Sequence, residues 1–351
     1  MGIRLREKIG YGLGDTASSM LWKLFSVYLM FFYTDICGID AWVVGVLFLV
    51  TRIWDSLLDP VVGLLCDRTS SRWGTFRPWA GPSASWTAAV AVVAALAVVL
   101  FFVTFSTTRE RVRPVRAERH PVLLSLRDLL HNRPWLILAG AAVCLQVFNA
   151  FRESGTIYFF KYCVAGETVG TVSFAGIALT GSALFLAVGP FFNIAGIVLI
   201  PFAADRFGRR RTLVGTLLLT AVFSFAFYFV RQGGYSVLLL AQALISLSVG
   251  GVLPLLWAMS ADTADYAERR SGRRDTGLIF SSYSMAQKMG WAVGSAATAW
   301  ILSLAGFEAN AVQSPAALTV IGCLQSVFPA LAALGTCAFI LFYPLADSRP
   351  K

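Results

Sequence analysis

Three charged side chains recur at helical spacing in an otherwise apolar stretch near the N-terminus. Arg52, Asp55 and Asp59 stand at positions i, i+3 and i+7, which places them within about 60° of one helix face. A charge at the centre of a bilayer costs about 2.5 to 3.5 kcal/mol on insertion scales, so three in one membrane span require a partner, a cavity or a function. The stripe indicates a functional site.

Two carboxylates one helical turn apart favour a bound cation. Their repulsion falls when oxygen ligands hold Na⁺ or Li⁺, or when a proton binds. Pro60 has no N–H, so the carbonyl of Ser56 loses its helical donor and is predicted to add an oxygen ligand; a simple kink is the alternative. Lys288 is the predicted counter-charge in the empty site. Its alternative is a lysine that reaches toward the membrane surface.

Two further stretches and a single tryptophan carry candidates for sugar binding. Sugar hydroxyls need hydrogen-bonding partners, and the apolar face of a pyranose stacks on aromatic rings. The candidates are Ser19, Trp22, Lys23, Arg152, Tyr158 and Trp257. Packing against lipid is the alternative for Trp257. The nearby Lys161 is interpreted as a side chain that reaches the membrane surface.

The composition indicates which elements must position these residues. Hydrophobic residues make up 57% of the 351 and charged residues 14%, and the mean hydropathy is +0.69, which excludes a water-soluble fold. Stretches of about 20 residues cross a bilayer as helices. Nine are predicted: 13–36, 41–65, 82–105, 135–163, 173–203, 211–231, 235–260, 277–305 and 316–344. The fold class is therefore all-α, a polytopic protein of the lipid bilayer.

Other functions are disfavoured. The net charge is +10, but the arginines lie in short connectors, as the positive-inside rule requires of cytoplasmic loops, so nucleic acid is not an expected partner. Six cysteines form no CxxC pair, which argues against a disulfide framework or a zinc site. Catalytic motifs are missing, and both histidines lie in the central loop, so neither an enzyme nor a cofactor is expected.

The basic N-terminus precedes an uncleaved first helix and is placed in the cytoplasm.

Four basic connectors separate the stretches, at 67–79, 107–134, 205–211 and 262–275. An even number of spans should lie between connectors on one side of a membrane, yet only 82–105 lies between the first two. The count predicts an abnormal N-terminal half. Two connectors begin alike, with Asp67–Arg68 and Asp205–Arg206. These pairs are predicted to form a cytoplasmic gate that exchanges charge partners between states; ordinary solvated turns are the alternative.

Several longer runs resemble a known family. These are YGLGDTASSM at 11–20, FFYTDICGID at 31–40, RIWDSLLDPVVGLLCDRTSSRWGTFRPW at 52–79 and ADTADYAERRSGRRDTGLIFSSYSMAQKMG at 261–290. They resemble the glycoside-pentoside-hexuronide:cation symporters, the melibiose carrier family of the major facilitator superfamily. The resemblance implies that Asp55 and Asp59 are cation-site carboxylates, with Lys288 near them on helix eleven. It places Arg152 on helix seven, and Ser19 where the melibiose carrier has a sugar-binding aspartate.

The resemblance also implies a cause for the abnormal count. Family members have twelve helices, whereas here residues 80–85 lead directly into a stretch similar to the family's helix six. About three helices are missing.

The expected organisation is a truncated N-terminal bundle (1–105), a central cytoplasmic loop (106–134) and a six-helix C-terminal bundle (135–351). We expect a monomeric inner-membrane carrier that moves a sugar or glycoside with Na⁺ or H⁺ by alternating access; a degenerate, non-transporting protein is the alternative. The sugar, the ion and the direction stay open.

Overall fold

The computed structural model describes seven parts of the chain: residues 29–51, 129–164, 172–174, 177–179, 181–231, 233–271 and 276–345. The chain divides into two compact units. Apart from Leu29, every described residue belongs to one of them, which combines Met30–Pro60 with His120–Lys351. The short N-terminal segment therefore packs in the same unit as the C-terminal helices.

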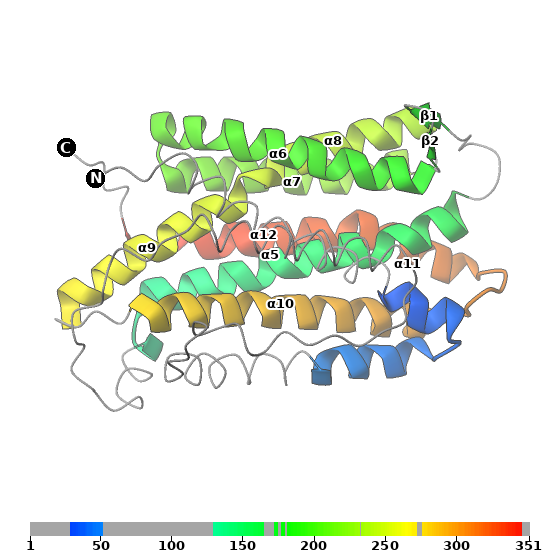
Figure 1. The fold of residues 1–351 in the computed structure, drawn as a ribbon, viewed down its shortest axis with the longest axis horizontal. Coiled ribbons are helices and arrows are strands. Elements are labelled where there is room, and N and C mark those ends of the chain that lie inside the picture. The colour runs from blue at the N-terminus through cyan, green and yellow to red at the C-terminus, as the bar shows by residue number, and fades with distance from the viewer. Residues whose placement is uncertain are drawn as a thin grey trace, which may run out of the picture. The chain divides into compact units, whose positions relative to one another are not determined.

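The described residues are helical apart from connecting loops and one hairpin (Figure 1). The N-terminal segment contains the π-helical turn η1 (Phe32–Ile36) and a helix over Ala41–Thr51. The C-terminal part contains α5 (Arg133–Tyr158), η3 (Phe159–Cys163), α6 (Gly181–Phe207), α7 (Arg209–Val230), α8 (Tyr235–Gly250), α9 (Val252–Ser271), α10 (Thr276–Leu304), α11 (Pro315–Gln325) and α12 (Val327–Leu341). Every predicted stretch after residue 134 thus contains helix, which confirms the helical class for this part.

Five helical segments in the described part are long and apolar enough to cross a membrane: Arg133–Cys163, Leu184–Phe207, Arg209–Val230, Tyr235–Arg269 and Pro315–Leu341. The predicted stretch 277–305 is helical as α10 but is not among the five. Lys288 and several hydroxyl groups in α10 lower its hydropathy. Large apolar side chains on α6 and α7 are exposed, including Phe191, Phe202 and Phe229, as expected for helices that face lipid.

The predicted helix start at residue 173 is wrong. Residues Val172–Phe174 (β1) and Ile177–Leu179 (β2) pair antiparallel, with Val172 opposite Leu179, and helix α6 begins only at Gly181. The β-branched and aromatic side chains at Val172, Phe174 and Ile177 favour a strand. A short apolar strand and the start of an apolar helix cannot be separated by hydropathy alone.

The stretch predicted at 316–344 is interrupted at Ser326, where φ is −131° and ψ is −78°. Gln325 has Pro329 four residues later, and proline has no N–H to donate to the Gln325 carbonyl. The backbone N–H of Ser326 donates to Cys323 O (3.1 Å), while its hydroxyl donates to Gly322 O (2.7 Å). Ser326 therefore satisfies the carbonyls of Gly322 and Cys323 at the break, and Gln325 O is left for a partner outside the helix.

The stretch predicted at 235–260 is interrupted at Gly251 and ends later than expected. Pro254 removes the donor for Gly250 O, and α8 gives way to α9 at this point. Helix α9 then continues to Ser271. Its last turns carry Asp262, Asp265 and Glu268, so hydropathy could not reveal that the helix extends beyond the apolar stretch.

Glycines bring the backbones of α6 and α8 into contact. A Cβ added to Gly250 would lie 2.3 Å from Asn193 O, and one added to Gly196 would lie 2.4 Å from Leu247 O. Both obstacles are backbone atoms, which cannot rotate away. Small residues allow such close approach in membrane helices. The two glycines therefore set the distance between α6 and α8.

Gly250→Ala is expected to destabilise the protein by about 1 to 3 kcal/mol, because the added methyl group forces α8 away from α6. Unfolding of the purified protein in detergent would measure the loss. Gly215→Ala in α7 is the matched control, since nothing lies within 4 Å of a Cβ at Gly215 and alanine favours a helix by about 1 kcal/mol. Equal destabilisation by both changes would contradict the packing account.

Candidate functional site

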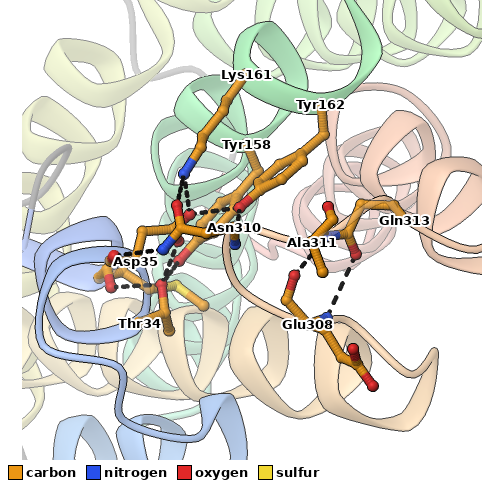
Figure 2. A network of polar contacts seen from close by, with 10 residues as sticks. Thr34, Asp35, Tyr158, Lys161, Tyr162, Glu308, Asn310, Ala311 and Gln313 are labelled. Carbon is orange, nitrogen blue, oxygen red and sulfur yellow. Dashed lines mark hydrogen bonds and ion pairs between the residues drawn. The ribbon is translucent and has the colours of Figure 1, made fainter.

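A polar network lies at the end of the bundle where η1, η3 and the loop between α10 and α11 meet (Figure 2). Its centre is Asp35, whose side chain is only 1% exposed. Oδ1 of Asp35 accepts from Lys161 Nζ (2.5 Å) and from the Tyr162 hydroxyl (2.5 Å). Oδ2 accepts from Thr34 Oγ1 (2.8 Å). Paired with a cation and hydrogen-bonded on both oxygens, the carboxylate is compensated for its burial.

Asn310 joins the loop between α10 and α11 to this carboxylate. Its φ of 60° is left-handed, a conformation that asparagine tolerates better than most residues. The side chain donates to the backbone carbonyl of Asp35 (2.8 Å) and accepts from Lys161 Nζ (2.6 Å). The backbone N–H of Asn310 donates to the Tyr162 hydroxyl oxygen (3.0 Å). One residue of the loop thus contacts both other segments (Figure 2).

Tyr158 extends the network into the core. Its side chain is fully buried, and its hydroxyl lies 2.7 Å from Thr34 Oγ1. Phe31 and Phe307 pack edge-on against its ring. Tyr158, a predicted sugar ligand, therefore has a protein partner for its hydroxyl in this structure.

Arg152 lies at the interruption between α11 and α12. The residue is 8% exposed. Nη1 donates to Gln325 O (3.0 Å), the carbonyl that Pro329 leaves without a helical donor, and Nη2 donates to the side-chain oxygen of Gln242 in α8. Gln325 Nε2 in turn donates to Arg152 O (2.8 Å) and Thr156 Oγ1 (3.1 Å). The guanidinium replaces a missing backbone donor and ties α5 to two other helices.

Two other predicted residues lie in different surroundings. Trp257 stacks on Phe280, with ring centroids 6.0 Å apart, and meets Tyr283 edge-on at 4.8 Å. Its ring is therefore occupied by aromatic packing between α9 and α10. Lys288 is half-buried in the middle of α10, and its role as a counter-charge stays a prediction.

The opposite end of the bundle carries the basic connector 205–211 (Figure 1). Asp205 and Arg206, the predicted gate pair, are exposed. Arg209 Nη1 instead contacts Asp262 Oδ2 (2.5 Å), which joins the start of α7 to α9, and Arg210 donates to Leu341 O at the end of α12. The connector is therefore joined to α9 by an ion pair and to α12 by a hydrogen bond, both from arginines after Gly208.

Tyr343 lies at the same end of the bundle, two residues after α12. Its hydroxyl lies 3.0 Å from Thr263 Oγ1 and donates to Met259 O (3.3 Å). Burial raises the pKa of Tyr343 to about 12, so the phenol stays protonated and available as a donor at physiological pH. The contact fixes the residues after α12 against α9.

Nine predicted site residues lie outside the described residues: Ser19, Trp22, Lys23, Arg52, Asp55, Ser56, Asp59, Asp67 and Arg68. Their roles stay predictions. Conversely, sequence reasoning missed Asp35 and Asn310 as site residues. Asp35 falls in the last turn of the predicted stretch 13–36, where a charge is inexpensive at a membrane surface. Its buried partnership with Lys161 depends on contacts between distant segments.

The chain aligns with one family over nearly its whole length. A family described as MFS/sugar transport protein matches residues 10–84 and 80–347. The protein therefore belongs to this sugar transport family of the major facilitator superfamily. This confirms the resemblance found in the sequence, and it identifies a multi-pass membrane transporter family rather than an enzyme.

Three curated relatives illustrate the similarity. A putative glycoside/cation symporter of Escherichia coli K12 is 28% identical over 442 residues, covering 99% of this chain and 93% of the relative. The isoprimeverose transporter of Lactiplantibacillus pentosus is 28% identical, covering 98% and 90%. A glucuronide carrier protein homolog of E. coli K12 is 26% identical, covering 99% and 94%. All three alignments are longer than the 351 residues of this chain.

Proposed function

We propose that the protein is a secondary active transporter that moves a sugar or glycoside together with Na⁺ or H⁺ by alternating access. The observation that carries this proposal is the family match, which runs from residue 10 to residue 347 and includes residues on each side of the central loop. The relatives' names, a glycoside/cation symporter and an isoprimeverose transporter, support a sugar or glycoside as the substrate class. Li⁺ remains a further candidate for the coupling ion.

The proposed cation site consists of Asp55 and Asp59 with the carbonyl of Ser56, and Arg52 and Lys288 supply the counter-charge. Asp205–Arg206 and Asp67–Arg68 are proposed for the cytoplasmic gate, the former with Arg209 and Asp262 beside it. Since the basic connectors face the cytoplasm under the positive-inside rule, the N-terminus is placed there too.

The sugar ligands are proposed mainly from the N-terminal candidates Ser19, Trp22 and Lys23. The described candidates Arg152, Tyr158 and Trp257 already have protein partners. Those three could bind a sugar only in a state in which the contacts rearrange. The N-terminal candidates therefore have priority in tests of sugar binding.

A second candidate is a family member that does not transport. It is favoured by the length of the alignments: the first runs over 442 residues, 91 more than this chain has. About 90 residues correspond to roughly three helices with their loops. The two family matches also meet at residues 80–84, where the sequence predicts the loss. A shortened N-terminal half removes helices that would line one side of a central pathway.

Uptake into proteoliposomes separates the two candidates. The purified chain would be reconstituted and offered labelled isoprimeverose, a methyl glycoside or a glucuronide, with an inward Na⁺ or proton gradient. A carrier shows saturable uptake and counterflow with at least one pair. Absence of both, while the L. pentosus relative transports in parallel vesicles, would support the non-transporting candidate.

A further inference from the structure

The polar network around Asp35 joins three segments that are far apart in the sequence. Asp35 ends the first predicted span, Lys161 and Tyr162 end the span that begins with α5, and Asn310 lies in the loop between α10 and α11. Figure 2 shows the four side chains converging on one point. The contacts therefore hold one end of the first span against the ends of three C-terminal helices.

The two charges are buried to very different degrees. The Asp35 side chain is 1% exposed, whereas that of Lys161 is 32% exposed. Lys161 Nζ also lies 4.9 Å from the centroid of the Phe31 ring and 5.0 Å from that of Tyr162. If the contact opened without water, Asp35 would be left as a buried, unpaired charge. Separation of the pair therefore requires that water enter this end of the bundle.

The position of the network indicates in which transport state water would reach the ion pair. It lies at the end opposite the arginines of the connector 205–211 (Figure 1), the end predicted to face away from the cytoplasm. In alternating access, this end must be closed when substrate is exchanged with the cytoplasm and open to water in the other state. A contact that is stable when dry and separates only when water enters fits a gate.

We propose that Asp35, Lys161, Tyr162 and Asn310 form a latch that closes the extracytoplasmic end of the carrier and opens in its outward-facing state. The gating role rests on the proposed transport function; in a protein that never opens, the same contacts would only hold the segments together. In the structure described here the latch is closed.

The test uses Thr34→Cys as a reporter in every protein compared, because Thr34 is 1% exposed and contacts Asp35 Oδ2, with Cys37 and Cys163 replaced by serine. A membrane-impermeant maleimide is applied to right-side-out vesicles. Asp35→Asn and Lys161→Gln are each expected to speed labelling about tenfold, since each removes a charge-assisted hydrogen bond from the closed state. The double variant should label no faster than the faster single variant, because both changes remove one shared contact.

Glu308→Gln is the matched control. It removes a carboxylate from the same end of the bundle, and Glu308 contacts Gln313 through its backbone N–H and carbonyl rather than through its side chain. Labelling of Asp35→Asn at the rate of Glu308→Gln would overturn the latch, as would rapid labelling of the reporter itself. Tyr162→Phe, which keeps the ion pair and removes one hydrogen bond, gives a milder variant with an expected increase of about threefold.

Labelling needs neither sugar nor a cation gradient, so its outcome is separate from that of the uptake assay. Faster labelling in the latch variants without any uptake would show that the contacts close this end of the protein, and would contradict the proposed transport function. Uptake with unchanged labelling in the latch variants would support the transport function and contradict the latch. In a working carrier, the latch variants should also slow active uptake more than Glu308→Gln does, because the closed outer end is one step of the cycle.

Discussion

Replacing Arg152 by methionine is expected to lower the free energy of unfolding by roughly 2 to 6 kcal/mol. The change leaves two acceptors, Gln325 O and the Gln242 side-chain oxygen, without the donors they have in the structure. Gln325 is buried and Gln242 is half-buried, and an acceptor left unsatisfied costs about 1 to 3 kcal/mol. Methionine has similar length and fills the space, so the loss reports mainly on hydrogen bonding. Equilibrium unfolding in mixed detergent micelles would measure it.

Arg231→Met is the matched control for this prediction. Arg231 is half-buried, donates to Tyr228 O (3.0 Å) and lies 3.8 Å over the Tyr228 ring, so its loss should cost less than about 1 kcal/mol. Pro329→Ala tests the mechanism, because it restores an N–H for Gln325 O. In the Arg152→Met background it should recover about 1 kcal/mol. Equal losses for Arg152→Met and Arg231→Met would show that the guanidinium is not the needed donor.

Asp55→Asn and Asp59→Asn are each expected to abolish the stimulation of sugar uptake by the coupling cation. An amide keeps the size of the side chain but removes the charge that attracts Na⁺ or accepts a proton. The ratio of uptake with and without the cation gradient should fall to about one, because a cation that no longer binds cannot shift the equilibrium between the two states. Initial rates in proteoliposomes give the measurement.

Asp40→Asn is the corresponding control. Asp40 is exposed in the short connection before the helix Ala41–Thr51, and its side chain accepts from Trp42 N (2.7 Å), a bond that asparagine also forms. Stimulation should therefore persist. Persistent stimulation in both Asp55→Asn and Asp59→Asn would remove these residues from the coupling mechanism.

The helices after residue 134 could be predicted because hydropathy is a local property of the chain. The family could also be recognised from the sequence, because the resemblance is carried by short continuous runs of residues such as RIWDSLLDP. The interruptions at Gly251 and Ser326 have a local signal as well, namely Pro254 and Pro329 four residues after a carbonyl that needs a donor. That signal identifies the unsatisfied carbonyl but not the residue that satisfies it.

The contacts of the site could not be predicted in this way, because they join residues that are far apart in the sequence. Lys161 was interpreted as a side chain that reaches the membrane surface, and its 32% exposure agrees with that in part. Nothing in the neighbouring sequence indicates that Asp35, well over a hundred residues earlier, lies 2.5 Å away. Similarly, the sequence predicts Arg152 as a sugar ligand because sugar hydroxyls need hydrogen-bonding partners. Its pairing with Gln242 and Gln325 depends on how α5, α8 and α11 pack.

Helix α10 has a consequence for how the protein enters the membrane. Although it is 29 residues long, it is not among the described helices apolar enough to span a bilayer by composition. Its Gly290 and Gly294 lie directly against α5: a Cβ on Gly290 would be 2.5 Å from Val143 O, and one on Gly294 would be 2.6 Å from Ala150 Cβ. During synthesis α5 emerges first. We therefore expect α10 to be inserted by partitioning onto α5 already in the bilayer, so that biogenesis of the second half depends on an interface and not on hydrophobicity alone.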